Sequence, residues 1–167
     1  MSATAKVIEP RWERRKDARP GELLAAALDL FVEKGFAATR LEDVARRAGV
    51  SKGTLYLYFD SKEELFKAVI RESYLPSLMH GESLLKDFTG SAEQLLRAFL
   101  RMWWDEVGET KQAGLTKLVI AEAGNFPEIA RFYHDEVIQR ANALLRHAIE
   151  RGVQSGEFQP VNEQYAH

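Results

Sequence analysis

The sequence predicts an all-α protein, in which a small N-terminal domain of three helices precedes a larger C-terminal helical domain. Apolar residues recur at the helical spacing of about 3.6 residues through most of the chain, and helix-capping residues precede several of these stretches. No segment of useful length alternates apolar and polar residues as a strand does. With 167 residues, of which 46% are hydrophobic, the chain contains enough apolar material for a real core.

The first predicted helix runs from Pro20 to Lys34. Proline suits the first turn of a helix because its missing N–H has no partner there. Gly35 stands where a left-handed C-cap is needed. The apolar face of this helix consists of Leu24, Leu28, Phe31 and Val32.

Two short helices follow, separated by the turn Ala48-Gly49-Val50. Thr39 and Glu42 have the spacing of a capping box at the start of the first, and Ser51 is expected to cap the second, which extends to about Tyr58. This length and turn chemistry are typical of a helix-turn-helix, whose second helix lies in the major groove of DNA. The two helices are expected to pack against Leu28 and Phe31 through Leu41, Val44, Ala45, Val50, Leu55 and Phe59.

The remaining segments also read as helices. Ser61 and Glu64 repeat the capping-box spacing before a helix that reaches about Leu75, where Pro76 is expected to end or kink it. Ser91 and Gln94 begin the next predicted helix, and a further helix contains Leu115, Leu118 and Val119. Pro127 begins a long helical stretch with one apolar stripe, which ends near Gly152–Gly156. The stretch Pro160-Val161-Asn162-Glu163 resembles a further helix start, which leaves open whether residues are missing after His167.

Composition narrows the class of protein. Cysteine is absent, which excludes disulfides and thiolate metal sites and fits a reducing compartment. No apolar run approaches the ~18–20 residues of a membrane span, and the N-terminus lacks the apolar core of a signal peptide. We therefore expect a soluble cytoplasmic protein that does not bind a membrane. Residues 1–62 carry 12 Lys/Arg and 9 Asp/Glu, whereas residues 63–167 carry 11 and 16, so only the front of the chain suits a polyanion.

The outward face of the second short helix is the candidate DNA-binding surface. Its groups are small, hydroxylated, aromatic or cationic, which suits phosphates and base edges: Ser51, Lys52, Gly53, Thr54, Tyr56 and Tyr58. Gly53 is consistent with close approach of the backbone to DNA, although a first-turn position where helix propensity matters little would also explain it. For Tyr56 and Tyr58 the alternative is half-buried packing.

The run from Thr39 to Phe66, TRLEDVARRAGVSKGTLYLYFDSKEELF, closely resembles the DNA-binding signature of the tetracycline-repressor (TetR/AcrR) family. With LFVEKGF at Leu30 to Phe36, the resemblance covers roughly residues 20–70. It implies that Lys52, Gly53 and Thr54 approach bases and phosphates, that Tyr56, Tyr58 and Lys62 hold the backbone, and that Thr39 is a phosphate-contacting helix start. The family often has histidine where this chain has Tyr58.

The resemblance also implies an organisation and a mechanism. Residues 1–19 would be a basic arm in which Arg11, Arg14, Arg15 and Lys16 touch the duplex or are merely solvated. Residues 20–66 would be the DNA-binding domain, residues 61–75 the linking helix, and residues 67–167 the ligand-binding and dimerisation domain. The family acts as a homodimer on palindromic double-stranded operators, most often as a repressor released by a small-molecule effector. The dimer interface is expected around residues 137–165.

Aromatic side chains in the second domain are candidate walls of a pocket for a hydrophobic or aromatic effector. For each of them core packing is the more usual role, because an aromatic residue at helical spacing most often belongs to the core. The candidates are Phe99, Met102, Trp103, Trp104, Leu118, Glu122, Phe126 and Tyr133.

Two other functions are weighed. A hydrolase is suggested only by His80-Gly81-Glu82-Ser83, and the sequence has neither a nucleophile elbow nor a phosphate-binding glycine loop. A metal site could be suggested by His134, Asp135 and Glu136, but neighbouring positions on one helix face different ways. We therefore expect no enzyme, metal or cofactor. A helical protein-interaction module that has lost DNA binding is the second alternative, against which stands the excess of Lys and Arg over acids in residues 46–62.

Overall fold

The computed structural model describes residues 20–160, which are helical and contain no strand, so the predicted all-α class is confirmed. The predicted N-terminal arm and residues 161–167 lie outside the described part. The α-helices are α1 (Pro20–Ala38), α2 (Leu41–Arg47), α3 (Lys52–Tyr56), α4 (Lys62–Asp87), α5 (Ala92–Trp103), α6 (Lys111–Glu122), α7 (Pro127–Tyr133) and α8 (Gln139–Gln154). Short π-helical segments, Trp104–Gly108 and His134–Ile138, continue α5 and join α7 to α8.

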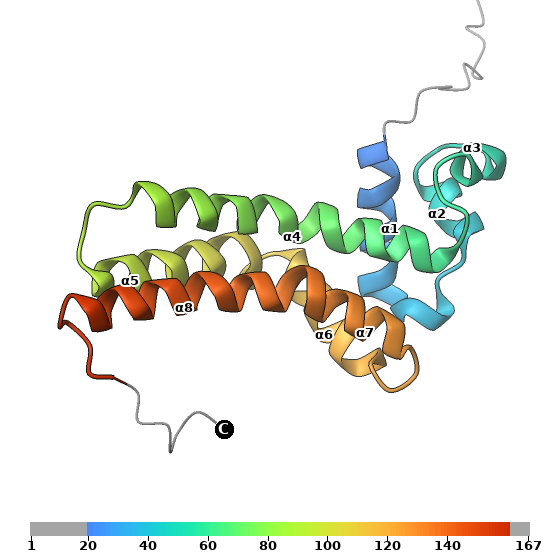
Figure 1. The fold of residues 1–167 in the computed structure, drawn as a ribbon. Coiled ribbons are helices and arrows are strands. Elements are labelled where there is room, and N and C mark those ends of the chain that lie inside the picture. The colour runs from blue at the N-terminus through green and yellow to red at the C-terminus, as the bar shows by residue number, and fades with distance from the viewer. Residues whose placement is uncertain (1–19, 161–167) are drawn as a thin grey trace, which may run out of the picture.

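The helices form two parts that share one long helix. Figure 1 shows α1, α2 and α3 together at one end, while α4 begins beside them and extends to the other end, alongside α5 and α8. Helix α1 packs against both α4 and α6, so the N-terminal unit is joined to the rest through two helices. No helix in residues 20–160 is long and apolar enough to cross a membrane.

A continuous apolar core underlies this arrangement. Phe31, Phe36 and Phe66 contact one another through their rings, and the same cluster extends through α4 into α6 and α7. A smaller core lies between α5 and α8, around Leu95, Phe99 and Ala148. The predicted inward face of the two short helices is confirmed, because Leu41, Val44, Ala45 and Leu55 are buried.

Several predicted helix ends are confirmed by their hydrogen bonds. Ser91 and Gln94 form a complete capping box, and Pro127 occupies the first turn of α7. Ser61 Oγ accepts from the backbone N–H of Glu64. Gly35 has a positive φ of 83°, which breaks the regular helix inside α1 as the sequence predicted.

The expected helix end at Pro76 is wrong, because α4 continues through it to Asp87. A proline inside a helix removes one backbone hydrogen bond and is unfavourable by about 3 kcal/mol. Tyr74, Ser77, Leu78 and Gly81 are all buried around this position. Packing against α5, α6 and α8 therefore offsets a local preference that the sequence alone shows clearly.

Candidate nucleic-acid interface

Three local features, in α3 and in the turn before it, place this helix at the surface. Gly49 adopts φ 71° in the turn after α2, a conformation that glycine reaches without strain. Ser51 caps the helix, since its Oγ accepts a hydrogen bond of 3.1 Å from the N–H of Thr54. Leu55 is the one buried residue of α3 and attaches it to the core. The predicted helix-turn-helix geometry is therefore present.

The opposite face of α3 is open. Ser51, Lys52 and Gly53 are exposed, and Thr54 is partly exposed with its hydroxyl 2.8 Å from that of Ser51. Tyr56 and Tyr58 are 41% and 47% exposed and belong to neither apolar core, so part of each side chain is open to a partner. The intervening Leu57 is 83% exposed and projects from the same turn of chain.

Gly53 is not required by packing within this chain. A Cβ built at Gly53 would have Ser51 Oγ as its nearest neighbour, at an ordinary contact distance of 3.8 Å. The backbone of Gly53 has no positive φ. Two explanations of the glycine remain. The backbone of Gly53 approaches a partner closely, or helix propensity matters little at this first-turn position.

Lys52 contacts both an acid and an aromatic ring. Its ammonium forms an ion pair with Glu42 of α2 and sits 5.6 Å from the centre of the Tyr56 ring. The hydrogen bond from Lys52 lowers the pKa of Glu42, and the same bond raises the pKa of Lys52. Both groups are charged at neutral pH, so the pair is a true ion pair at the edge of the exposed face.

Lys62 and Thr39 have structural partners that the sequence did not reveal. The Lys62 ammonium donates to the carbonyl oxygens of Phe36 (2.8 Å) and Ala37 (3.0 Å), where it satisfies the C-terminal end of α1. Thr39 is fully buried, and its hydroxyl lies 2.7 Å from the carbonyl oxygen of Gly35. The capping box predicted for Thr39 and Glu42 is wrong, because Arg40 is the N-cap of α2.

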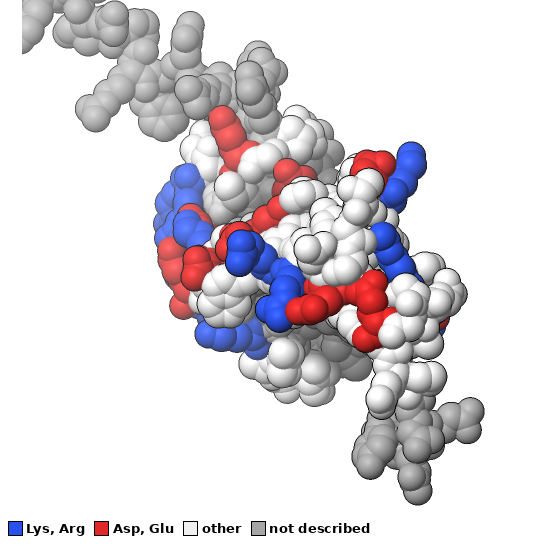
Figure 2. Space-filling model, turned by 90° about the vertical axis from the view of Figure 1, so that its left-hand side faces the viewer, with Lys and Arg blue, Asp and Glu red and all other residues white. Residues whose placement is uncertain are grey.

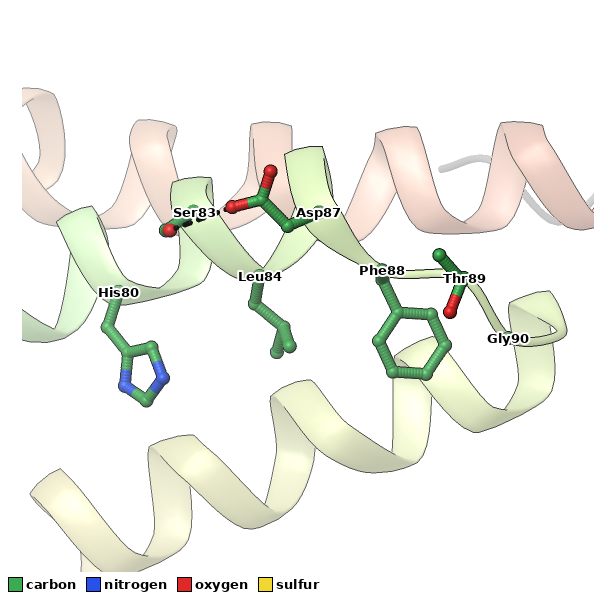
Figure 3. Close-up of a pocket in the computed structure, with 7 residues that line it drawn as sticks. All are labelled: His80, Ser83, Leu84, Asp87, Phe88, Thr89 and Gly90. Carbon is green, nitrogen blue, oxygen red and sulfur yellow. Dashed lines mark hydrogen bonds between the residues drawn. The ribbon is translucent and has the colours of Figure 1, made fainter.

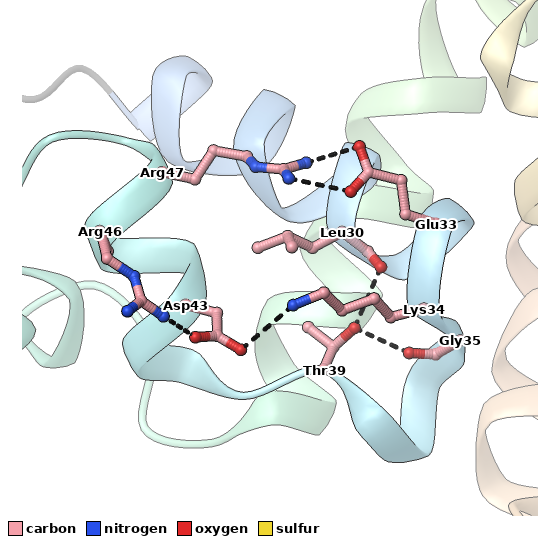
Figure 4. Close-up of polar contacts among 8 residues, drawn as sticks. All are labelled: Leu30, Glu33, Lys34, Gly35, Thr39, Asp43, Arg46 and Arg47. Carbon is pink, nitrogen blue, oxygen red and sulfur yellow. Dashed lines mark hydrogen bonds and ion pairs between the residues drawn. The ribbon is translucent and has the colours of Figure 1, made fainter.

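The burial of Thr39 also corrects its place in the predicted interface. The Thr39 hydroxyl has no exposed surface and donates to carbonyl oxygens of α1, so it does not face a phosphate. Its bonds instead fix the bend between α1 and α2 (Figure 4). Thr39 is therefore not part of the candidate interface.

Exposed ion pairs within α2 and between α2 and α1 occupy two cations of the predicted basic stretch, Arg46 and Arg47. Arg47 donates to both carboxylate oxygens of Glu33, at 2.7 and 2.9 Å, and Asp43 lies between Arg46 and Lys34 (Figure 4). The formal excess of Lys and Arg in residues 46–62 therefore overstates the free positive charge of this surface.

The predicted pocket residues fall into separate groups. Phe99, Met102 and Trp103 line one cavity of about 240 Å³ between α5 and α8, together with Leu100, Ala141, Leu144 and Leu145. The last four were not among the predicted site residues, although Ala141 and Leu144 belong to an apolar stripe that is readable in the sequence. Gly81 permits the close packing behind this cavity, because a Cβ there would lie 2.7 Å from Leu144 Cδ1.

The other predicted pocket residues lie elsewhere. Trp104 is 57% exposed, and its indole N–H donates to Glu109 at 2.7 Å, so it does not line the cavity. Phe126 contacts the ring of Phe36 at a centroid distance of 4.6 Å. Leu118 and Glu122 are beside Gly35, because a Cβ atom added at this glycine would lie 3.9 Å from the side chain of Leu118 and 3.8 Å from that of Glu122. These three residues therefore join α6 and α7 to α1.

Tyr133 belongs to a buried network of hydroxyl groups. Its hydroxyl lies 3.2 Å from Thr116 Oγ1, which lies 2.7 Å from the hydroxyl of Tyr74, and Tyr74 also donates to the carbonyl of Gln112 at 2.7 Å. Burial raises the pKa of Tyr74 far above its usual value. Trp103 stacks on Tyr74 at 6.2 Å, so this network supports the wall of the cavity without lining it.

An open depression at the turn between α4 and α5 is lined by His80 and Ser83, two of the four residues that suggested a hydrolase (Figure 3). Ser83 Oγ donates to Asp87 at 3.4 Å, and His80 Nδ1 is 2.6 Å from Glu106, so the two side chains have different partners. Among residues 20–160 no cluster of three His, Asp or Glu side chains could hold a metal ion. On the end of the molecule opposite α3, cations and acids are interspersed without a patch of one sign (Figure 2).

Comparison with known proteins assigns both parts of the chain. Residues 23–69 match the family described as "Bacterial regulatory proteins, tetR family", and residues 86–164 match "Tetracyclin repressor-like, C-terminal domain". The HTH-type transcriptional regulator RutR of Escherichia coli strain K12 is 33% identical over 155 residues, which cover 91% of this chain and 70% of RutR.

Two further similarities concern a second regulator and a solved structure. The HTH-type transcriptional activator FasR of Mycolicibacterium smegmatis is 35% identical over 124 residues, and these cover 67% of this chain but only 56% of FasR. The structure of the transcriptional regulator FadR from Bacillus subtilis, in complex with stearoyl-CoA, has a TM-score of 0.69 at 20% identity. It covers 89% of this chain and 78% of FadR, and at that identity it shows a shared fold alone.

Proposed function

The chain belongs to the TetR family of bacterial regulatory proteins, and from this premise we propose that it is a ligand-responsive transcriptional regulator that binds operator DNA through α3. The observation that carries the proposal is the open face of α3, which is fixed by the Ser51 cap and the buried Leu55. A helix held in this way can enter the major groove without rearrangement of the fold.

Each exposed group on this face has a role suited to its chemistry. Lys52, Gly53 and Thr54 begin the helix and would approach base edges and phosphates, with the Ser51 hydroxyl beside them. Tyr56 and Tyr58 would donate their hydroxyls to phosphate oxygens, since neither hydroxyl has a hydrogen-bond partner among the described residues. Lys62 has one N–H left for a phosphate after its two bonds to α1.

We propose that the protein acts as a homodimer on a palindromic operator and, by the commonest mode of its family, as a repressor. Two α3 helices in successive major grooves require a separation of about 34–36 Å. The DNA-binding domain would comprise residues 20–66, and α4 would carry changes of spacing from the rest of the chain. The proposed dimer interface, around residues 137–165, includes α8, on which Ile149 is an exposed apolar residue.

The effector is proposed to be apolar and to bind between α5 and α8. The side chains that line the cavity there carry no charge, and Phe99, Met102 and Trp103 supply much of its wall. Its volume of about 240 Å³ lies below the ~300–1,000 Å³ of typical ligand sites. A small hydrophobic molecule, or the apolar end of a larger one such as an acyl chain, would suit it, and the effector can release DNA only by its preference for one of two conformations.

Neither alternative function has comparable support. The hydrolase idea is weakened by the separate partners of His80 and Ser83, and the relatives named above are all regulators. A protein-interaction module would not need three consecutive exposed positions at the start of α3 that combine a hydroxyl, a cation and a glycine. The open α3 face therefore favours DNA.

The test is to compare DNA binding by Lys52→Ala and Tyr56→Ala with that of the parent protein. Fluorescence anisotropy would use a labelled duplex selected from a random-sequence pool with the parent protein. We expect both variants to bind more weakly while their circular-dichroism spectra stay helical, and Lys52→Ala to reduce the slope of affinity against salt by about one unit. Lys117→Ala, which removes an exposed lysine of α6, is the control. Parental affinity in both α3 variants would contradict the assignment.

A further inference from the structure

The ion pair between Lys52 and Glu42 occupies the one cation of α3. Glu42 lies in the first turn of α2, and its carboxylate reaches across the turn to the ammonium at the start of α3. The same ammonium also lies 5.6 Å from the centroid of the Tyr56 ring. In the protein without DNA, the group best placed to meet a phosphate already has an anionic partner.

We propose that Glu42 is a restraint on DNA binding, which competes with the duplex for Lys52 and lowers the affinity of the protein for its operator. The proposal rests on the proposed function, in which Lys52 contacts DNA. When the protein docks, the ammonium exchanges the carboxylate of Glu42 for a phosphate or a base edge. The carboxylate released in this exchange then faces a polyanion without its partner, which further opposes binding.

The accessibility of the pair makes such an exchange feasible. The side chains of Lys52 and Glu42 are 56% and 51% exposed, so water and phosphate can replace each partner without unpacking the core. Exposed ion pairs contribute little to stability, because solvent screens them and two long side chains lose freedom. Glu42 is therefore suited to adjust affinity and is not needed to hold α2 against α3.

The neighbouring ion pairs do not have this geometry. Arg47 binds Glu33 with both of its terminal nitrogens, and that pair joins α2 to α1. Arg46 pairs with Asp43 within α2 itself. Only the Glu42 pair, among those of the described residues, restrains a side chain that α3 presents.

A double-mutant cycle tests the proposal. The affinities of the parent, Glu42→Gln, Lys52→Ala and the double variant would be measured by anisotropy with the same selected duplex, first at low and then at moderate salt. We expect Glu42→Gln to bind about two- to fivefold more tightly at low salt, the range of an exposed ion pair. The gain should shrink as salt screens the pair, and it should vanish when Lys52 is already alanine.

The control and the possible outcomes separate this inference from the proposed function. Glu128→Gln removes an exposed carboxylate of α7, outside both α3 and the proposed dimer interface, so it reports the effect of net charge alone and should leave affinity unchanged. Unchanged affinity in Glu42→Gln, or an equal gain with and without Lys52, would overturn the restraint while the α3 interface stands. If Lys52→Ala bound DNA like the parent, the proposed contact between Lys52 and DNA would be contradicted, and the proposed restraint by Glu42 would be contradicted with it.

Discussion

Replacement of Leu55 by alanine should detach α3 from the core. Leu55 has no exposed surface and is the single buried residue in a helix of five residues. Leucine-to-alanine changes at such positions cost about 2–5 kcal/mol, from lost burial and from the cavity left behind. A helix this short has no stability of its own, so the loss falls first on the docking of α3.

The loss should appear in two measurements. Urea unfolding followed by circular dichroism should report a lower free energy of unfolding, by about 2 kcal/mol or more. DNA affinity should fall about tenfold or more even where the protein is folded, because only the fraction with α3 docked can bind. Leu57→Ala is the matched control, since Leu57 is 83% exposed and its removal should change stability by less than about 0.5 kcal/mol.

Two results would refute this reasoning. Parental stability in Leu55→Ala would mean that α3 is held by something other than the buried leucine. A large loss of stability with unchanged DNA affinity would mean that the docked form of α3 is not the form that binds.

Three further substitutions test other contacts. Tyr74→Phe should lower the free energy of unfolding by about 1–3 kcal/mol in calorimetry, because the hydroxyl bonded to Gln112 is lost, and an unchanged melting temperature would refute that bond. Thr39→Val should lower stability by about 1 kcal/mol in urea titrations yet leave the DNA affinity of the folded protein intact; weaker binding would restore Thr39 to the interface. Gly49→Ala should cost about 1–2 kcal/mol in the same titrations because φ is 71°, and no loss would show that the turn relaxes.

Local signals in the sequence predicted the N-terminal unit well. The Ser51 cap, the turn at Gly49 and the inward face around Leu55 each depend on neighbouring residues, so a short window contains all the necessary information. The capping box at Ser91 and the start of α7 at Pro127 were predictable for the same reason.

Tertiary packing decided the features that the sequence did not predict. Pro76 signals a helix end locally, yet the buried residues on both sides keep α4 continuous. Thr39 and Glu42 have the spacing of a capping box, but the Thr39 hydroxyl finds carbonyl partners nine and four residues earlier, in α1. A sequence pattern cannot rank a local partner against one that the fold brings near.

The same limit applies to the candidate sites. The exposed groups on α3 could be identified from helical spacing, whereas the occupation of Lys52 by Glu42 depends on the angle between two helices. In the second domain, spacing identified apolar side chains but not their directions. Trp103 lines the cavity and the adjacent Trp104 points to solvent, a difference that follows from the packing of α5 against α8.

Dimethyl sulfate interference mapping on a selected operator duplex tests the central claim most directly, because the reagent methylates guanine N7 in the major groove and adenine N3 in the minor groove. We expect methylation at guanine N7 to block binding in two symmetric clusters whose centres are about one helical turn apart, the spacing of paired recognition helices. Interference confined to adenine N3, or to a single cluster, would contradict the entry of two copies of α3 into successive major grooves.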